Sequence, residues 1–229
     1  DESITFAAWA LSPAAHPIDC SNAGTTLRLL VGQAARLPAS TVLIGDASLR
    51  TRPGAGLLTA LRQLGARVES VGDCAPITVR GPMTGGRAEV DAGLSSQFVS
   101  ALLLSAPFLE NSTELVVSSL RSTPYVRMTE RMLADFGVAL EPTASGWRIA
   151  GQQRAERPHY RVAGDWSAAA FVLVAAAITG GRVAVDGLID DGLQGDAVLL
   201  QLLGRFGVEV TYAGTAAESA PSTLCAGGV

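Results

Sequence analysis

The sequence is poor in aromatic residues, in histidine and in cysteine. Of its 229 residues, Phe, Trp and Tyr make up 5%, and only two are His. The core must therefore be built mainly from Ala, Val and Leu, and a histidine-based metal site or triad has little to draw on. The three cysteines, Cys20, Cys74 and Cys225, lie far apart and in no Cys-x-x-Cys arrangement. This usage is typical of reduced thiols in the cytoplasm rather than of a disulfide framework or a zinc site.

Charged residues are also sparse, at 17% against 48% hydrophobic residues, and the net charge is only −4. This balance excludes a disordered chain and offers neither a basic stripe for nucleic acid nor a polybasic face for a membrane. The longest apolar run, residues 168–178, is too short to span a bilayer. The start, DESITFAAWA, lacks the basic segment of a signal peptide, and we interpret it as a cut or processed beginning. We expect a soluble, cytoplasmic globular protein.

A repeat organises most of the chain. Three segments each predict an amphipathic helix, a glycine stop and a strand: LLTALRQLGARVES, RMLADFGVALE and LLQLLGRFGVEVT. Their glycines are Gly65, Gly137 and Gly207, so the spacings are 137 − 65 = 72 and 207 − 137 = 70. We predict a positive φ at all three glycines, because each one directly follows the last apolar helical position.

A second helix type recurs in step with the first, in segments that begin at Asn22, Ser95 and Asp165. These helices are apolar nearly all round, which predicts burial on every side. Strand-like runs follow them, and PITVRG, RAEVDAG, GWRIAG and HYRVAG predict further strands. The sequence thus predicts an α/β fold of repeated βαβαββ units around buried helices. The ending, AGTAAESAPSTLCAGGV, is interpreted as a frayed tail.

Each buried helix opens with small polar residues. They are Asn22, Gly24 and Thr25 in the first helix, Ser95, Ser96 and Gln97 in the second, and Asp165 and Ser167 in the third. Such residues cap helices, and they also leave N–H groups and a partial positive charge available to an anion. Helix capping and an anion site are therefore both open interpretations of these positions.

Five short motifs then resemble those of the 5-enolpyruvylshikimate-3-phosphate synthase family. They are NAGTTLR (22–28), GDASLRTRP (45–53), SSQF (95–98), STPY (122–125), and GDWSAAAF followed by QGD (194–196). Each motif alone is weak, but the five occur in the family's order, from about residue 19 to about residue 211, on a repeat derived independently. The resemblance implies two lobes built from βαβαββ units, with the active site between them.

The resemblance implies roles for residues near the first buried helix. Gly24 would allow close approach of the backbone to phosphoenolpyruvate, and Arg52 would pair with the charged groups of that substrate. Asn22 and Thr25 would belong to the same substrate-binding set. A solvated loop cation is the alternative interpretation of Arg52.

Further along the chain, Ser95, Ser96 and Ser122 would hold shikimate 3-phosphate, largely through its phosphate. Gln97 would lie between the two substrates, and Tyr125 would pack near the shikimate ring. A simple turn with an aromatic anchor is the alternative for the segment from Ser122 to Tyr125.

The catalytic proton donor and acceptor are not identified in the sequence. Asp165 is a weak candidate, with a plain N-cap as its alternative role.

The resemblance also implies the reaction, which is enolpyruvyl transfer from phosphoenolpyruvate to shikimate 3-phosphate with release of phosphate in aromatic amino acid biosynthesis. It implies no metal or organic cofactor, no nucleic acid or membrane partner, and a monomeric parent enzyme. We assign residues 1–161 to an incomplete first lobe and 162–229 to the first unit of a truncated second lobe, and expect the fragment to be inactive alone. The alternatives are a UDP-N-acetylglucosamine enolpyruvyl transferase and a non-catalytic anion-binding module of the same fold.

Overall fold

The computed structural model describes residues 11–120, 122–157 and 159–212, and the backbone of residues 223–227. The chain divides into two compact units, residues 1–156 and residues 157–229. The boundary thus follows residue 156, whereas the sequence placed it after residue 161. Whether the two units correspond to the two lobes stays a prediction, and each unit is described here by itself.

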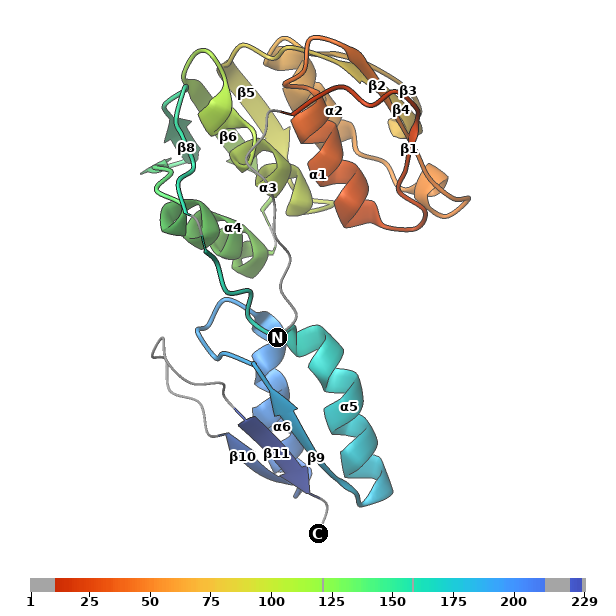
Figure 1. Cartoon of the computed structure of the whole chain (residues 1–229), viewed down its shortest axis with the longest axis vertical. Helices are drawn as coiled ribbons and strands as arrows, with labels where there is room; N and C mark the ends of the chain where they lie inside the picture. The colour runs from red at the N-terminus through yellow and green to blue at the C-terminus, as the bar shows by residue number, and fades with distance from the viewer. Residues whose placement is uncertain (1–10, 121, 158, 213–222, 228–229) are drawn as a thin grey trace. The chain divides into compact units, whose positions relative to one another are not determined.

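The larger unit contains two successive βαβαββ repeats (Figure 1). The first consists of β1 (Ile18–Asp19), α1 (Gly24–Ala34), β2 (Ser40–Ile44), the 3₁₀ helix η1 (Leu49–Thr51), α2 (Ala55–Gln63), β3 (Arg67–Val71) and β4 (Cys74–Arg80). The second consists of β5 (Gly86–Asp91), α3 (Gln97–Leu103), the 3₁₀ helix η2 (Ala106–Phe108), β6 (Thr113–Ser118), α4 (Thr123–Asp135), β7 (Glu141–Thr143) and β8 (Gly146–Ile149). The predicted repeat is confirmed for these two copies.

The two repeats form separate sheets with the same strand order. The first sheet runs β1-β2-β4-β3, and the second runs β5-β6-β8-β7. In both sheets the first two strands pair in parallel, joined by a helix, and the last two strands pair as an antiparallel hairpin. The fourth strand is inserted between the second and the third, which it pairs on either side.

Helix α3 is the centre of the larger unit. It packs against α1, α2 and α4, and six of its seven residues are buried, as the sequence predicted for this helix. The first turn of α1 lies near the start of α3, and the two helices also meet at their C-terminal ends through Gln33, which bonds the Leu104 carbonyl. The helices α1 and α3 therefore run parallel, with their starts at one end and their C-termini at the other.

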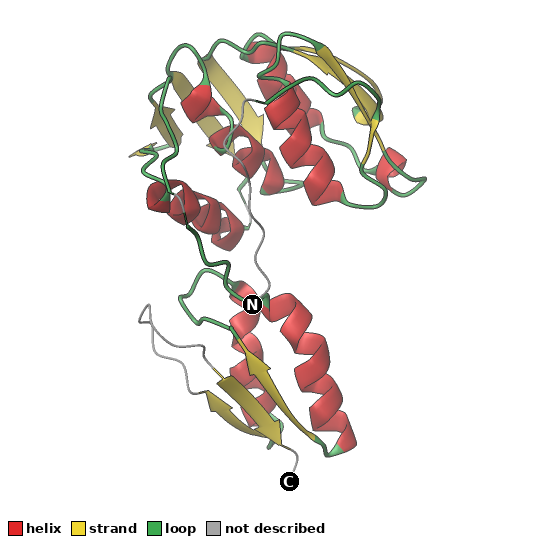
Figure 2. Ribbon diagram, viewed as in Figure 1, coloured by secondary structure: helices red, strands yellow, loops and turns green. Residues whose placement is uncertain are grey.

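The smaller unit carries a third, incomplete copy (Figure 2). It contains α5 (Trp166–Thr179), β9 (Arg182–Asp186), the 3₁₀ helix η3 (Gly195–Val198), α6 (Leu199–Arg205), β10 (Glu209–Tyr212) and β11 (Thr223–Gly227). Its sheet order, β10-β11-β9, matches the third, fourth and second strands of the other two sheets. Helices α5 and α6 pack against this sheet around Trp166, Leu173 and Leu203.

Two predictions for this copy are wrong. The run HYRVAG forms no strand in its described residues. Its last residue, Gly164, donates its backbone N–H to the carbonyl oxygen of Gly187, the residue after β9, with 2.8 Å between nitrogen and oxygen. The ending is not entirely a frayed tail, because residues 223–227 form β11, which pairs with both β9 and β10. Backbone pairing with two neighbours stabilises this strand, although the ending as a whole is composed of small and polar residues.

The glycine stops are confirmed. Gly65, Gly137 and Gly207 have φ values of 102°, 78° and 81°, and each one follows the end of a helix. Glycine populates this region without the steric cost that a Cβ brings, so the chain can leave the helix at once and begin the next strand.

The prediction of burial on every side is wrong for α5. Its apolar residues Phe171 and Ile178 are 81% and 79% exposed, whereas Trp166 and Leu173 are fully buried. The described sheet and α6 cover only one side of this helix. An all-apolar sequence indicates that a helix can be buried all round, and it does not supply the elements that cover it.

Candidate functional site

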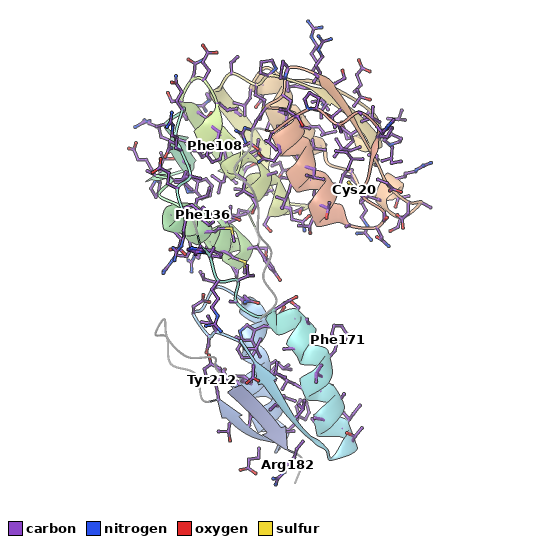
Figure 3. The ribbon with its side chains drawn as sticks, in the orientation of Figure 1. Cys20, Phe108, Phe136, Phe171, Arg182 and Tyr212 are labelled. Atoms are coloured by element: carbon purple, nitrogen blue, oxygen red, sulfur yellow. The ribbon has the colours of Figure 1, made fainter. Side chains whose placement is uncertain are left out.

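A group of polar side chains gathers at the start of α1. Strand β1 ends just before Cys20, a buried residue labelled in Figure 3, and the chain then turns into α1. No side chain caps this helix, whose N-cap position is Ala23. Asn22 instead turns its Oδ1 to Arg52, which donates from Nη2 at 3.1 Å. The same nitrogen lies 3.0 Å from the Ser48 hydroxyl oxygen, so Arg52 is fixed to the start of α1 rather than solvated alone.

Gln97, the first residue of α3, joins this group to the second repeat. Its Nε2 donates to the Thr25 hydroxyl oxygen at 2.6 Å, and its Oε1 accepts from Arg28 Nη1 at 2.6 Å. The Arg28 guanidinium also lies over the Phe98 ring, 5.4 Å from its centroid. The amide is therefore held from both sides, in a fixed orientation between the two helices.

Two arginines, Arg28 and Arg52, share the space next to Gly24, and we call them the arginine pair. A Cβ built on Gly24 would lie 3.1 Å from Arg28 Nη1 and 3.6 Å from Arg52 Nη1. Burial lowers the pKa of Arg28, and the nearby charge of Arg52 lowers it further. No ion pair to a carboxylate involves either arginine within the described ranges. A partly buried cation and an exposed one, adjacent and without a carboxylate partner among the described residues, form a site suited to an anion.

The serines at the start of α3 differ in what they do. The Ser95 hydroxyl accepts from the Gln97 backbone N–H at 3.2 Å, so this side chain helps to begin the helix. Ser96 is the N-cap residue by position, yet its side chain makes no capping hydrogen bond and is only 8% exposed. Capping therefore does not explain Ser96, whose hydroxyl group remains available to a ligand.

Ser122 and Tyr125 lie at the start of α4. Ser122 is the N-cap residue and makes no side-chain capping bond, and Tyr125 is half exposed. Helix α4 is joined to α3 by Thr129, whose hydroxyl group bonds that of Ser100 at 2.9 Å. Within the described part of the chain, no hydrogen bond links Ser122 or Tyr125 to the group around Gln97. The structure thus brings the two helices together but does not join these two side chains to the others.

Asp165 lies in the smaller unit, and there it caps α5. Its Oδ1 accepts from the Ser167 backbone N–H at 2.8 Å, as an N-cap does. The Ser167 hydroxyl group bonds the Asp196 carboxylate. The side chain of Gln194 accepts from the Trp166 N–H at 3.0 Å and donates to the Gly164 carbonyl oxygen at 2.9 Å. The structural role of Asp165 is therefore evident, whereas a catalytic role stays a prediction.

The structure brings together Asn22, Gly24, Thr25, Arg52 and Gln97 from the residues singled out in the sequence. It adds Arg28 and Ser48, to which sequence reasoning assigned no role. Arg28 stands four residues after Gly24, on the same face of the helix, and that spacing is the signal that could have found it.

Among the residues that the structure describes, no three His, Cys, Asp or Glu side chains stand close enough to hold a metal ion. None of the described helices combines the length and apolar character needed to cross a membrane.

Comparison with known proteins gives a consistent result. The family model for EPSP synthase (3-phosphoshikimate 1-carboxyvinyltransferase) matches residues 6–226. The 3-phosphoshikimate 1-carboxyvinyltransferase of Methanocorpusculum labreanum is 41% identical over 203 residues, which are 88% of this chain and 48% of that protein. The enzyme of the same name from Halobacterium salinarum is 41% identical over 204 residues, 85% of this chain and 46% to 47% of its own length, depending on the strain.

A solved structure agrees with these relatives. The EPSP synthase of Acinetobacter baumannii superimposes with a TM-score of 0.68 at 27% identity, covering 93% of this chain and 48% of that one. The chain thus spans about half the length of the relatives that it matches. The repeat, the motifs and these comparisons agree, and the chain belongs to the EPSP synthase (3-phosphoshikimate 1-carboxyvinyltransferase) family.

Proposed function

We propose that this chain takes part in transferring the enolpyruvyl group of phosphoenolpyruvate to the 5-hydroxyl of shikimate 3-phosphate, with release of phosphate. The relatives' shared name supports this reaction. The observation that carries the proposal is the arginine pair beside Gly24, which has no carboxylate partner among the described residues. A reaction between two anionic substrates needs fixed cations and hydrogen-bond donors that are in place before the substrates arrive.

In this proposal, phosphoenolpyruvate binds at the start of α1. Its phosphate and carboxylate groups bind the arginine pair, because guanidinium groups match both anions in geometry and charge. Gly24 leaves room for the anion close to both guanidinium groups. Asn22 and Thr25 act through their neighbours, since Asn22 holds Arg52 and Thr25 holds Gln97.

Shikimate 3-phosphate binds at the starts of α3 and α4. Ser96 and Ser122 donate their hydroxyl groups to its phosphate, and neither hydroxyl group makes a capping bond within the protein. Ser95 also donates its O–H to the phosphate, because the bond that its oxygen accepts from the Gln97 N–H leaves that donor free. Gln97 lies between the two substrates, and the exposed ring of Tyr125 packs against the shikimate ring.

For catalysis we propose Asp165, which lies at the head of α5. The reaction needs no metal or organic cofactor. We further propose a cytoplasmic location, which the free thiols of Cys20 and Cys74 support, and a monomeric parent enzyme.

The reaction is tested by phosphate release from phosphoenolpyruvate, in a protein that includes this chain. Phosphate release that requires shikimate 3-phosphate supports the proposal. Release that requires UDP-N-acetylglucosamine instead would assign the chain to the sister reaction, and binding of both anions without release would indicate a non-catalytic module.

The substrate assignment is tested by calorimetric titration of the chain with shikimate 3-phosphate and with plain shikimate. A hydrogen bond to a charged group contributes about 1.5–3 kcal/mol, so Ser96→Ala should weaken binding of the phosphorylated ligand roughly tenfold or more. Plain shikimate should bind equally to both proteins. The same loss for both ligands, or no loss, would show that Ser96 does not contact the phosphate.

A further inference from the structure

A pocket lies at the C-terminal ends of helices α1 and α3, in the larger unit. Its volume is about 510 Å³, within the usual range for small-molecule sites. Six of its nine lining residues are apolar, although polar atoms form about half of its surface; the six are Leu11, Leu37, Pro82, Met83, Phe108 and Leu109. Because α1 is 11 residues long, roughly 16 Å of helix separates this pocket from the arginine pair. Figure 3 labels Phe108, which lines the pocket, and Cys20, which precedes the start of α1. We call it the tail pocket.

One cation lines the tail pocket, and it is held rigidly. The Arg36 guanidinium stacks on the Phe108 ring, 4.7 Å from its centroid, and donates from Nη1 to Gln33 Oε1 at 2.8 Å. The amide nitrogen of Gln33 is itself fixed, since it donates to the Leu104 carbonyl and to the fully buried Ser105 hydroxyl group. A cation positioned in this way is preorganised for a ligand.

Arg36 also lacks what a buried cation requires. Its Nε is inaccessible to solvent and has no hydrogen-bond partner among the described residues. Burial lowers the pKa of Arg36, since water no longer solvates the charge fully. None of the ion pairs within the described ranges includes Arg36. With Nη1 bound to Gln33 and Nε buried, Nη2 is the part of the guanidinium that remains for a carboxylate, which it binds through a charge-assisted hydrogen bond.

The tail pocket also has one anion. Glu110 lines it, is exposed, and forms no ion pair with any described residue. The Glu110 carboxylate disfavours a ligand that carries only a negative charge, and it favours a ligand that also carries a positive group. The lining thus combines one positive group, one negative group and an apolar wall.

From this combination we propose that the tail pocket binds a free α-amino acid with an apolar side chain. The ligand's carboxylate binds Arg36, its ammonium group faces Glu110, and its side chain packs against Phe108, Met83 and Leu109. The bound amino acid contacts the C-terminal ends of α1 and α3, whose opposite ends carry the substrate-binding groups. This site is independent of the proposed reaction, and it is tested without either substrate.

The test is calorimetric titration of the whole 229-residue chain with L-phenylalanine and L-leucine. Two analogues serve as ligand controls: 3-phenylpropionate, which lacks the ammonium group, and phenethylamine, which lacks the carboxylate. At least one amino acid should bind, and more tightly than both analogues. Arg36→Gln should weaken its binding about tenfold or more, because a charge-assisted pair is lost. The matched control Arg131→Gln, at an exposed arginine on α4, should bind the amino acid as the unchanged protein does.

Glu110→Gln provides a second test that does not depend on Arg36→Gln folding, since Glu110 is exposed. This variant should bind the amino acid several-fold more weakly and 3-phenylpropionate at least as well as before. The proposal is overturned if neither amino acid binds, or if 3-phenylpropionate binds as tightly as phenylalanine to the unchanged protein. Equal weakening by Arg36→Gln and Arg131→Gln, or no effect of Glu110→Gln, would overturn it as well.

Discussion

Gly24→Ala should separate binding of phosphoenolpyruvate from stability of the fold. The added methyl group would lie 3.1 Å from Arg28 Nη1 and 3.6 Å from Arg52 Nη1, in the space where we place the anion. Both neighbours are the far ends of flexible side chains, which can yield by a few tenths of an ångström. Alanine is also favoured over glycine in helices by up to about 1 kcal/mol, so we expect no loss of stability.

The expected loss of affinity follows from the contacts that the methyl group would displace. If the anion loses one charge-assisted hydrogen bond to the arginine pair, binding weakens by about 1.5–3 kcal/mol. This corresponds to about a ten- to 150-fold higher dissociation constant for phosphoenolpyruvate. Shikimate 3-phosphate should bind within twofold of the unchanged protein, because its proposed contacts lie at α3 and α4.

Gly32→Ala is the matched control on the same helix. Its methyl group would lie 3.0 Å from the Ala101 carbonyl oxygen and 3.0 Å from Ser105 Oγ, where α1 meets α3. The backbone cannot move aside as the end of an arginine side chain does, so this change should lower the melting temperature. At temperatures well below melting, the affinity for phosphoenolpyruvate should be unchanged. Calorimetry and thermal unfolding of both variants provide the test. If Gly24→Ala binds phosphoenolpyruvate within twofold of the unchanged protein, the anion does not occupy the space beside Gly24.

Three further predictions concern other parts of the chain. Gly137→Ala should lower the free energy of unfolding, measured by chemical denaturation, by about 1 kcal/mol, because φ is 78° there and no atom within 4 Å would meet the methyl group, so only the backbone conformation opposes the change. An unchanged free energy would show that this conformation imposes no cost. Asp165→Asn should change the free energy of unfolding by no more than about 0.5 kcal/mol, since both residues cap helices well. A large fall in phosphate release by the folded variant would indicate a catalytic role, and an unchanged rate would indicate that Asp165 only caps the helix. Burial, and secondarily Asp19, raises the pKa of Cys20; with the other two cysteines replaced by serine, it should react with iodoacetamide more slowly than a model thiol at pH 8, and an equal rate would contradict this.

The sequence predicted those features that depend on local chemistry. The glycine stops at Gly65, Gly137 and Gly207 were found because a left-handed residue directly after a helix favours glycine wherever the helix packs. The period of 70 to 72 residues followed from these three positions. Most of the binding residues were found through the family's motifs, which the sequence carries in order.

Features that depend on distant partners were not predicted. Strand β11 lies in an ending of mostly small and polar residues, and its pairing is supplied by β9 and β10. The open side of α5 depends on which elements cover it, about which its own sequence says nothing. The role of Arg28 depends on the place of Gln97, which lies 69 residues further along the chain.

The strand order has a consequence for synthesis of the protein. In each sheet the strand synthesised last lies between the second and third strands of its repeat. Those two strands therefore have no pairing with each other, and each pairs with the last strand only after it has been synthesised. Strand β9 ends at residue 186 and β11 begins at residue 223, which is 223 − 186 = 37 positions later. At about 5–20 residues per second, β9 waits roughly 2 to 7 s on the ribosome for its neighbour. The five residues of β11 therefore join β9 and β10 into one sheet. A nascent chain that stops before residue 223 leaves the facing edges of β9 and β10 unpaired and open to strands of other chains.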